Sequence, residues 1–241
     1  MQILWNGFPC EEFEFEGYKA YIVSPQPGTE VGKLVLKTLY WGAFPDIEIN
    51  LLKRGYHLAY VEKECRVPSK AECDRRARFV QFVSQKHNLD GKCVLVGMSF
   101  GGAQAMRFVH YYPEMVSCVY LDAPVLNYCA FPGKMGDVYR EKVWDQEFLY
   151  VYPGMKRYQL MNFDEHPINA VDTILEHKIP VLLVWGEQDT TVVYKEHGLL
   201  MEQAFEGSDL LNAVCVKHRG HHPHGRIGDN TDLVEYIVEH S

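Results

Sequence analysis

The segment from Lys92 to Tyr112, KCVLVGMSFGGAQAMRFVHYY, restricts the fold more than any other part of this chain. Residues 93–96 form a short apolar run typical of a buried strand, and a helical pattern follows the glycine-rich centre. Between the two, Gly97, Ser99 and Gly101 fill a G-x-S-x-G pattern, in which a sharp turn lifts the serine hydroxyl above the edge of a sheet. Such a pattern arises by chance in roughly one chain of this composition in twenty, so the assignment depends on the flanking strand and helix. We therefore predict that Ser99 is a catalytic nucleophile, and the alternative is a glycine-rich turn with an idle serine.

Strands and helices alternate through most of the remaining chain. Residues 12–24 alternate apolar and polar side chains around Gly17, which predicts a hairpin at the first edge of a sheet. Further strands are expected at 33–40, 56–61, 115–121, 180–185 and 212–216, and helices at 47–54, 70–87, 168–177, 193–205 and 231–240. Ser69 is expected to cap the helix that follows it. This order indicates one α/β domain over residues 1–241, with a mostly parallel central sheet, helices on both faces and an active site at the carboxyl ends of the strands.

Composition excludes several functional classes. The 241 residues are 47% hydrophobic and carry a formal net charge of −8, so no basic surface is expected for nucleic acid or an anionic membrane. No apolar run approaches the roughly 18 residues of a membrane span, and the N-terminal residues show no secretion signal. The seven cysteines include no C-x-x-C spacing, which disfavours a disulfide framework or a zinc site. We expect a cytoplasmic protein without a cofactor.

A nucleophilic serine needs a general base that is oriented by an acid, and the acid is expected just after a strand. Asp189 follows the apolar strand 180–185 through the turn GEQD and is the preferred acid. Asp122, at the end of the preceding strand, is its main rival, and Glu187 is the third candidate.

The base is expected in the histidine-rich segment VKHRGHHPHGR, residues 216–226, after the last predicted strand. We predict His221, because Gly220 gives the loop freedom to bring an imidazole over the serine, with His222 as the alternative. Clustered histidines also suggest a metal site. Adjacent histidines usually point apart and no cysteine or carboxylate lies at ligand spacing, so no metal is expected.

Acyl transfer also requires hydrogen-bond donors for the oxyanion that forms on the substrate. One is expected to be the amide of Phe100, directly after the nucleophile. The strand 33–40 runs into Trp41-Gly42-Ala43-Phe44-Pro45, where the amide of Ala43 is the predicted second donor and that of Gly42 the alternative. An ordinary strand-to-helix turn would have the same composition.

Residues 127–165 are irregular in pattern and rich in aromatic side chains. We expect a small cap inserted over the pocket, in which Phe131 and Trp144 contact the substrate. Trp41 and Phe44 flank the proposed oxyanion turn and would narrow the site, which favours an acyl chain of short or medium length. In the other interpretation, the aromatic residues form a small core of the insertion itself.

The motifs GMSFGG, LDAP, WGEQD and GHHPHG, in this order, resemble those of serine esterases of the α/β-hydrolase fold. More narrowly, residues 35–235 are similar to a bacterial group of esterase- or lipase-like hydrolases with motifs close to FGAFPE, G-x-S-x-GG, LDAPV and GHHPHS. Trp41 and Phe100 depart from that pattern, and residues 129–133 are a changed version of a Ser-Trp-Pro-Gly segment.

These observations predict a serine hydrolase that cleaves a small-molecule carboxylic ester, of a carbohydrate or aryl group among others, through an acyl-enzyme. A peptidase, thioesterase or acyltransferase would use the same three residues. A ligand-binding protein that keeps the fold without turnover is the non-enzymatic alternative.

Overall fold

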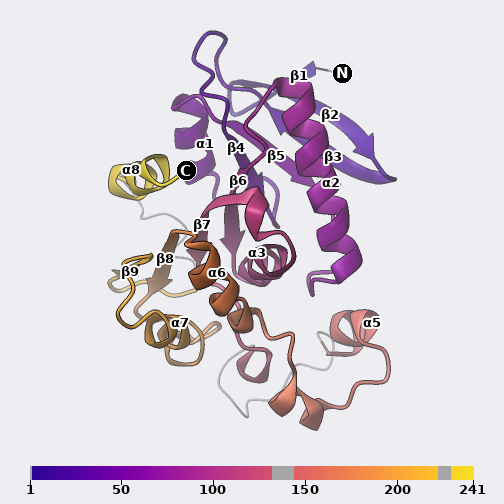
Figure 1. Cartoon of the computed structure of the whole chain (residues 1–241), viewed down its shortest axis with the longest axis vertical. Helices are drawn as coiled ribbons and strands as arrows, with labels where there is room; N and C mark the ends of the chain where they lie inside the picture. Colours follow the sequence, from indigo (N-terminus) through magenta and orange to yellow (C-terminus); the bar gives the residue numbers. More distant parts are fainter. Residues whose placement is uncertain (1, 132–143, 222–228) are drawn as a thin grey trace.

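A twisted sheet runs through the centre of the computed structural model, which describes residues 2–131, 144–221 and 229–241 (Figure 1). Within these residues the sheet has nine strands in the order β1-β2-β3-β5-β4-β6-β7-β8-β9. The strands are β1 (Gln2–Trp5), β2 (Phe8–Phe15), β3 (Tyr18–Val23), β4 (Leu34–Lys37), β5 (His57–Val61), β6 (Cys93–Met98), β7 (Val116–Asp122), β8 (Val181–Gly186) and β9 (Leu211–Val216). The pairs β1–β2, β2–β3 and β3–β5 are antiparallel, and all other neighbouring pairs are parallel. The six strands from β5 to β9 in the sheet order therefore have their carboxyl ends at the same edge.

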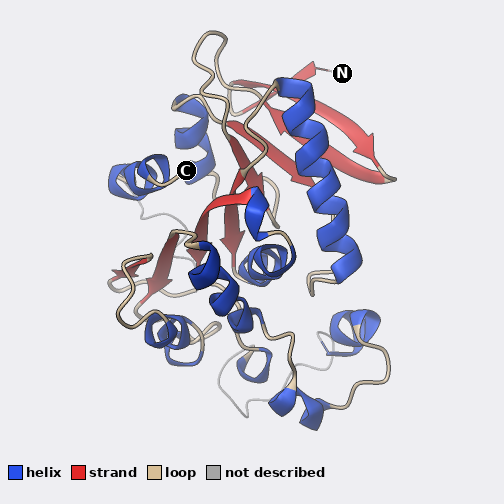
Figure 2. Ribbon diagram, viewed as in Figure 1, coloured by secondary structure: helices blue, strands red, loops and turns tan. Residues whose placement is uncertain are grey.

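Helices cover both faces of this sheet (Figure 2). They are α1 (Asp46–Lys53), α2 (Lys70–His87), α3 (Phe100–Tyr111), α5 (Leu149–Val151), α6 (Val171–His177), α7 (Gly198–Ala204) and α8 (Thr231–Glu239). Short 3₁₀ or π-helical turns lie at Pro113–Met115, Tyr128–Ala130, Trp144–Phe148, Arg157–Asn162, Pro167–Ala170 and Tyr194–Glu196. Helices α1 and α8 pack on one face, and α2, α3, α6 and α7 pack on the other. No helix of the described ranges combines the length and apolarity needed to cross a bilayer.

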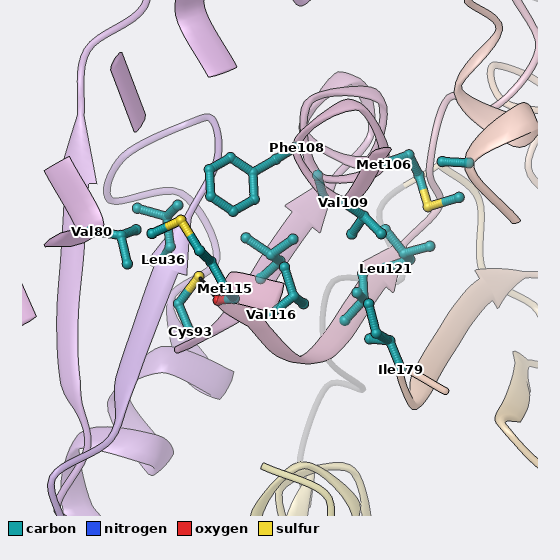
Figure 3. Packing of buried hydrophobic residues seen from close by; sticks show 14 of the residues in the cluster. Leu36, Val80, Cys93, Met106, Phe108, Val109, Met115, Val116, Leu121 and Ile179 are labelled. Carbon is teal, nitrogen blue, oxygen red and sulfur yellow. Dashed lines mark hydrogen bonds between the residues drawn. The ribbon is translucent and has the colours of Figure 1, made fainter. Parts of the chain in front are cut away.

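Alternate residues of the central strand β6 belong to opposite layers of the core. Cys93 and Leu95 pack with Phe108 of α3, and Figure 3 shows this layer at close range. Val94 and Val96 face the other layer, beneath α1 and α8. Successive side chains of a strand point to opposite faces, so a strand covered on both sides must be apolar throughout. This explains why an uninterrupted apolar run precedes the serine.

Most predicted elements are present, and the predicted cap of α2 is confirmed. The Ser69 hydroxyl accepts a hydrogen bond from the Glu72 amide at 3.1 Å, and Asn88 ends the helix in the left-handed conformation. The hairpin of β2 and β3 was predicted to form the edge of the sheet, and this is wrong because β1 pairs outside it. Four residues are too few to show the alternation of apolar and polar side chains that marks a strand. β1 is held in the sheet by its pairing with β2.

The helix predicted at 193–205 is interrupted at His197. Its backbone leaves the helical region at φ −134° and ψ −79°, so α7 starts only at Gly198. The side chain of His197 instead bonds the backbone of residues 126–130. A tertiary contact therefore determines where this helix begins.

The described residues of the 127–165 segment have an aromatic core of their own. Phe148 contacts the rings of Tyr128, Tyr152 and Phe163 at centroid distances of 5.1, 5.1 and 5.7 Å. The cluster packs on Phe100 and neighbouring residues at the start of α3. In Figure 1 this segment lies at the end of the molecule opposite the N-terminal strands, with α5 at its outer side. This core agrees with the second interpretation of the aromatic residues.

Candidate active site

Ser99 lies on a sharp turn between β6 and α3, as the motif predicts. Its backbone has φ 52° and ψ −119°, a conformation that non-glycine residues rarely adopt. Three hydrogen bonds of 2.9 Å hold it there: its amide donates to the Asp122 carbonyl, and its carbonyl accepts from the amides of Gly102 and Val125. A strained residue persists only where its surroundings fix it, and such positions are concentrated at functional sites.

Glycine is required close to this turn because the backbones approach each other. A Cβ at Gly102 would lie 2.3 Å from Cβ of Pro124 and 2.8 Å from its Cα. Real Cβ atoms do not come this close to other atoms. Helix α3 can therefore pack against Pro124, just after β7, only because residue 102 is a glycine.

The side chains of Ser99, His221 and Asp189 form a continuous hydrogen-bonded series. Nε2 of His221 lies 3.0 Å from the Ser99 hydroxyl, and Nδ1 lies 2.9 Å from Oδ2 of Asp189. The carboxylate accepts hydrogen bonds only, so Nδ1 carries the proton and Nε2 is left to accept the proton of the serine. The other carboxylate oxygen accepts from the amides of Thr191 and Val192 at 2.8 and 2.9 Å, which fixes its orientation.

Burial also differs along this series. The side chain of Asp189 is 2% exposed and that of His221 is 16% exposed. The acid is therefore shielded from water while the imidazole remains accessible from one side.

The rival acids are bonded elsewhere. Asp122 accepts a hydrogen bond from the Tyr120 hydroxyl at 3.1 Å and is fully buried at the end of β7. Glu187 pairs with Lys217 at 2.8 Å on the surface. The alternative base, His222, lies outside the described residues. Within the described ranges, no three side chains of the types that bind metals are grouped at one place.

The two amides predicted as oxyanion donors differ in their hydrogen bonds. Phe100 is the first residue of α3, and no hydrogen bond of its amide occurs among the described residues. The amide of Ala43, in contrast, donates to the Tyr40 carbonyl at 3.0 Å, so this turn already uses it.

Tyr40, which precedes this turn, is a further residue whose phenol interacts with Ser99 and Arg66. Burial raises the pKa of this phenol, while the charge of Arg66 and hydrogen bonds with Arg66 and Ser99 act in the opposite direction. Tyr40 has φ 60°, which turns the chain sharply after β4. Sequence reasoning missed Tyr40 because a tyrosine at the end of an apolar run is typical of ordinary strand packing.

The residues expected to contact substrate differ in their surroundings. Phe131 is 9% exposed and packs edge-on against the ring of Phe100 at 4.8 Å, whereas Phe44 is 49% exposed beside the turn. Trp41 stacks on Tyr21, Trp5 and Tyr60 at 4.7, 5.1 and 5.3 Å, so its ring is part of an aromatic stack on the N-terminal strands. Its partner Trp5 belongs to β1, which the sequence did not predict. The side chain of Trp144 lies outside what the structure describes.

Two histidines outside the series, one buried and one half-buried, were also missed. His197, which is 1% exposed, accepts hydrogen bonds at Nδ1 from the amides of Leu126 and Asn127, at 3.0 and 3.1 Å. Its Nε2 therefore carries the proton and donates to the Ala130 carbonyl at 3.2 Å. Burial lowers the pKa of His197 to about 4, and burial likewise lowers that of His166, which bonds Tyr128 and Leu160. Both are neutral side chains that hold the start of the 127–165 segment.

A family model described as the alpha/beta hydrolase fold matches residues 68–159, a range that includes Ser99. No curated protein sequence matches the chain. Among solved structures, dipeptidyl peptidase 4 from Porphyromonas gingivalis has a TM-score of 0.68 and 16% identity over 97% of this chain. The chain spans only 36% of the length of that peptidase.

Two further structures match over almost their whole length. S-formylglutathione hydrolase from Agrobacterium tumefaciens has a TM-score of 0.65 and 16% identity over 100% of this chain and 97% of its own. Est1E from Butyrivibrio proteoclasticus has a TM-score of 0.65 and 15% identity over 100% and 98%. At these identities the likeness concerns the fold alone. Together with the sheet order and the helices on both faces, it shows that this chain has the α/β-hydrolase fold.

Proposed function

We propose that the chain is a serine hydrolase that cleaves a carboxylic ester through an acyl-enzyme intermediate. The observation that carries this proposal is the hydrogen-bonded series of Ser99, His221 and Asp189, which starts at a strained turn. A serine hydroxyl is a weak nucleophile until a base removes its proton, and the series supplies a base with an acid behind it.

In the first half of the reaction, His221 accepts the hydroxyl proton as Ser99 Oγ bonds to the ester carbonyl carbon. The carbonyl electron pair moves onto oxygen, and Asp189 stabilises the imidazolium that forms. The C–O bond to the leaving alcohol then breaks, and His221 donates its proton to that alcohol. In the second half, water attacks the acyl-enzyme, His221 accepts its proton, and the acid leaves as Ser99 regains a hydrogen.

The amide of Phe100 and the hydroxyl of Tyr40 are the proposed oxyanion donors. The developing oxyanion is only two bonds from Ser99 Oγ, so a phenol whose pKa Ser99 affects is a candidate donor to it. Tyr40 therefore replaces Ala43 in this role. Removing a single donor of this kind lowers turnover by roughly 10² to 10³ in other hydrolases.

Phe44 and Phe131 are the proposed contacts of the acyl or alcohol group of the substrate. Because such rings would narrow the site, we propose an acyl chain of short or medium length. Aromatic rings near the nucleophile exclude water and accept either an alkyl or an aryl group. Because Trp41 belongs to a separate aromatic stack, we assign it to packing and leave it out of this set.

The test is a panel of aryl esters graded by acyl length, run beside acetylated sugars, a thioester and short peptide amides. We expect ester turnover, and a loss of roughly 10⁴ to 10⁶ in kcat for Ser99→Ala. A fluorophosphonate probe is expected to label Ser99 in the folded protein. Labelling without ester turnover but with amide cleavage would identify a peptidase, and a Ser99→Ala protein that keeps its activity would contradict the proposal.

A further inference from the structure

The hydroxyl of Thr38 connects the end of β4 to the turn that carries Ser99. Thr38 directly follows β4 and is fully buried. Its Oγ1 lies 2.7 Å from the Gly101 carbonyl oxygen and 3.0 Å from that of Val96. A hydroxyl has one hydrogen to donate, and the Val96 carbonyl already accepts from the Thr38 amide at 3.1 Å. The hydroxyl hydrogen is therefore assigned to the Gly101 carbonyl.

The peptide unit between Gly101 and Gly102 connects this contact to the nucleophile turn. Its carbonyl accepts from Thr38, and its N–H donates to the Ser99 carbonyl at 2.9 Å. The Ser99 carbonyl belongs to the same planar, trans peptide unit as the Phe100 N–H, so these two groups point in opposite directions. A contact that fixes the Ser99 carbonyl therefore also fixes the direction of the Phe100 N–H, a proposed oxyanion donor.

The end of β4 and the start of α3 lie close together at this point. A Cβ at Gly101 would lie 3.0 Å from Thr38 Oγ1 and 3.2 Å from the Cβ of Leu39, which is tighter than most real Cβ contacts. Because closely packed interiors transmit displacements, a shift of the strand end is expected to move the first turn of the helix.

A buried guanidinium holds Thr38 from the other side. Arg76 of α2 is 1% exposed, and its Nη2 donates to the Thr38 carbonyl at 2.8 Å. The same nitrogen lies 2.7 Å from a carboxylate oxygen of Glu72, and Nη1 donates to the amide oxygen of Gln104 in α3. Arginine keeps its charge in proteins, and a buried charge without partners is costly, so these contacts are maintained in the fold. Arg76 thus joins the end of β4 to both helices.

Thr38 and Arg76 are both shielded from solvent, so neither is placed to contact a substrate. We propose that Thr38 is a positioning residue that orients the Phe100 amide through the Gly101–Gly102 peptide, and that Arg76 fixes Thr38 in this role. The inference rests on the proposed hydrolase function, because it assigns a role within the same site. An oxyanion donor acts on charge that develops in the transition state, so the effect is expected in kcat and not in KM.

The experiment compares Thr38→Val with Thr38→Ser, read as kcat and KM on an aryl ester. Thr38→Val keeps the shape of the side chain and removes the hydroxyl, and kcat is expected to fall by about 10-fold to 100-fold with KM almost unchanged. Thr38→Ser keeps the hydroxyl and is expected to retain kcat within about 3-fold. Both variants are expected to keep the midpoint of the pH–rate profile of the parent chain, because the bond between His221 and Asp189 is left intact.

Arg76→Lys tests the second part of the proposal, since it keeps a positive charge beside Glu72 and removes the planar fork of donors. We expect kcat to fall by about 3-fold to 10-fold, and this loss to disappear in the Thr38→Val background. A residue that acts through the Thr38 hydroxyl has no effect once that hydroxyl is absent.

Two control variants accompany these measurements. Thr29→Val is the matched control, because the Thr29 hydroxyl also donates to a carbonyl, that of Gln26, at 2.7 Å in an exposed turn. It is expected to leave kcat and KM unchanged. Val83→Ala removes buried methyl groups from α2 and controls for stability. It is expected to lower the urea denaturation midpoint without lowering kcat.

Full kcat in Thr38→Val would overturn the inference, and so would an equal loss in Thr38→Ser. A rise of KM at constant kcat, a shifted pH–rate midpoint, or an Arg76→Lys effect of the same size with and without the Thr38 hydroxyl would also overturn it. A kcat loss in Val83→Ala as large as that in Thr38→Val would assign the effect to stability and overturn it as well.

Ser99→Ala in the same assay separates the two proposals. Turnover that does not depend on Ser99 overturns the proposed function, whereas Ser99-dependent turnover with full kcat in Thr38→Val overturns only this inference.

Discussion

Ser99, Asp189 and His221 follow the parallel strands β6, β8 and β9 and are joined by side-chain hydrogen bonds, whereas Tyr40, a proposed oxyanion donor, follows the parallel strand β4 on a turn with positive φ angles. In the first set, which we call the triad half, the backbone hydrogen bonds of the sheet bring the strand ends to a common edge. In the second region, the proposed oxyanion half, the ladder of β4 ends before Tyr40, and the turn that carries it is held by side chains. These are buried polar groups, among them the ion pair of Lys37 and Glu48, each 1% exposed.

The difference shows two ways to hold a site together. The sheet positions the triad half through its backbone bonds and apolar core, whose stability does not depend on a single side chain. The oxyanion half contains positive φ angles at Tyr40, Gly42 and Phe44, which are 60°, 77° and 46°. Lys37 holds this turn by donating to the Ala43 carbonyl at 2.8 Å. A buried charge left without its partner costs several kcal/mol, so this half is expected to be the more sensitive to single polar substitutions.

The largest expected effect lies in the triad half. Asp189→Asn is expected to lower kcat by roughly 10⁴, because the amide favours the wrong tautomer of His221, with little change in the denaturation midpoint. Steady-state kinetics on the best aryl ester and urea denaturation measure the two quantities. A loss below about 10-fold would mean that another acid, Asp122 first, orients His221.

In the oxyanion half, Lys37→Met is expected to destabilise the fold by about 3 to 5 kcal/mol, since Glu48 would remain buried without its partner. The free energy of unfolding in urea measures this loss. Replacing Glu48 by leucine in the same chain is expected to recover much of the stability. It is not expected to restore kcat, because the Ala43 carbonyl still lacks its donor and the turn that carries Tyr40 is released. Recovery of both quantities would show that the pair has no part in placing the turn.

The contact between the core and the 127–165 segment is expected to depend on pH through His197. The pKa of His197 is lowered from 6.5 to about 4 by burial, so below pH 6.5 the unfolded chain binds a proton that the folded chain does not. Stability is therefore expected to fall as pH decreases from about 6.5 to about 4, by about 3 kcal/mol at most from this group. Urea denaturation at pH 7 and pH 5 measures the slope.

His57 provides the matched control for this prediction. It is 4% exposed at the start of β5, and burial lowers its pKa to about 4 as well. His197→Asn and His57→Asn are each expected to reduce the pH dependence of stability, but only the first is expected to alter kcat at pH 7. An unchanged slope in His197→Asn would contradict the buried neutral state.

The two halves also differ in what the sequence could predict. Ser99, Asp189 and His221, which the structure joins by hydrogen bonds, were predicted together because each follows a strand within a short loop or turn. Tyr40 was interpreted as the end of a strand. Arg66 and Glu147 are 81 residues apart, and charged residues in loops are usually solvated, so no local pattern indicates that they meet. Their contact depends on how the 127–165 segment packs, which short-range periodicity does not encode.

The smallest expected effects come from two glycines, one in each half. Gly102→Ala in the triad half would press a methyl group against Pro124, and we expect a loss of about 1 to 3 kcal/mol in unfolding free energy. Gly42→Ala in the oxyanion half has open space, so only the cost of its φ of 77° applies, about 1 kcal/mol. The two substitutions add the same atom, and urea denaturation compares them directly. If Gly42→Ala were the more costly, close packing at the strained serine turn would be less restrictive than the backbone of the Tyr40 turn. The oxyanion half would then be the more rigid of the two, and the effect of Lys37 should be correspondingly smaller, because a turn that is rigid by itself needs no buried lysine to hold it.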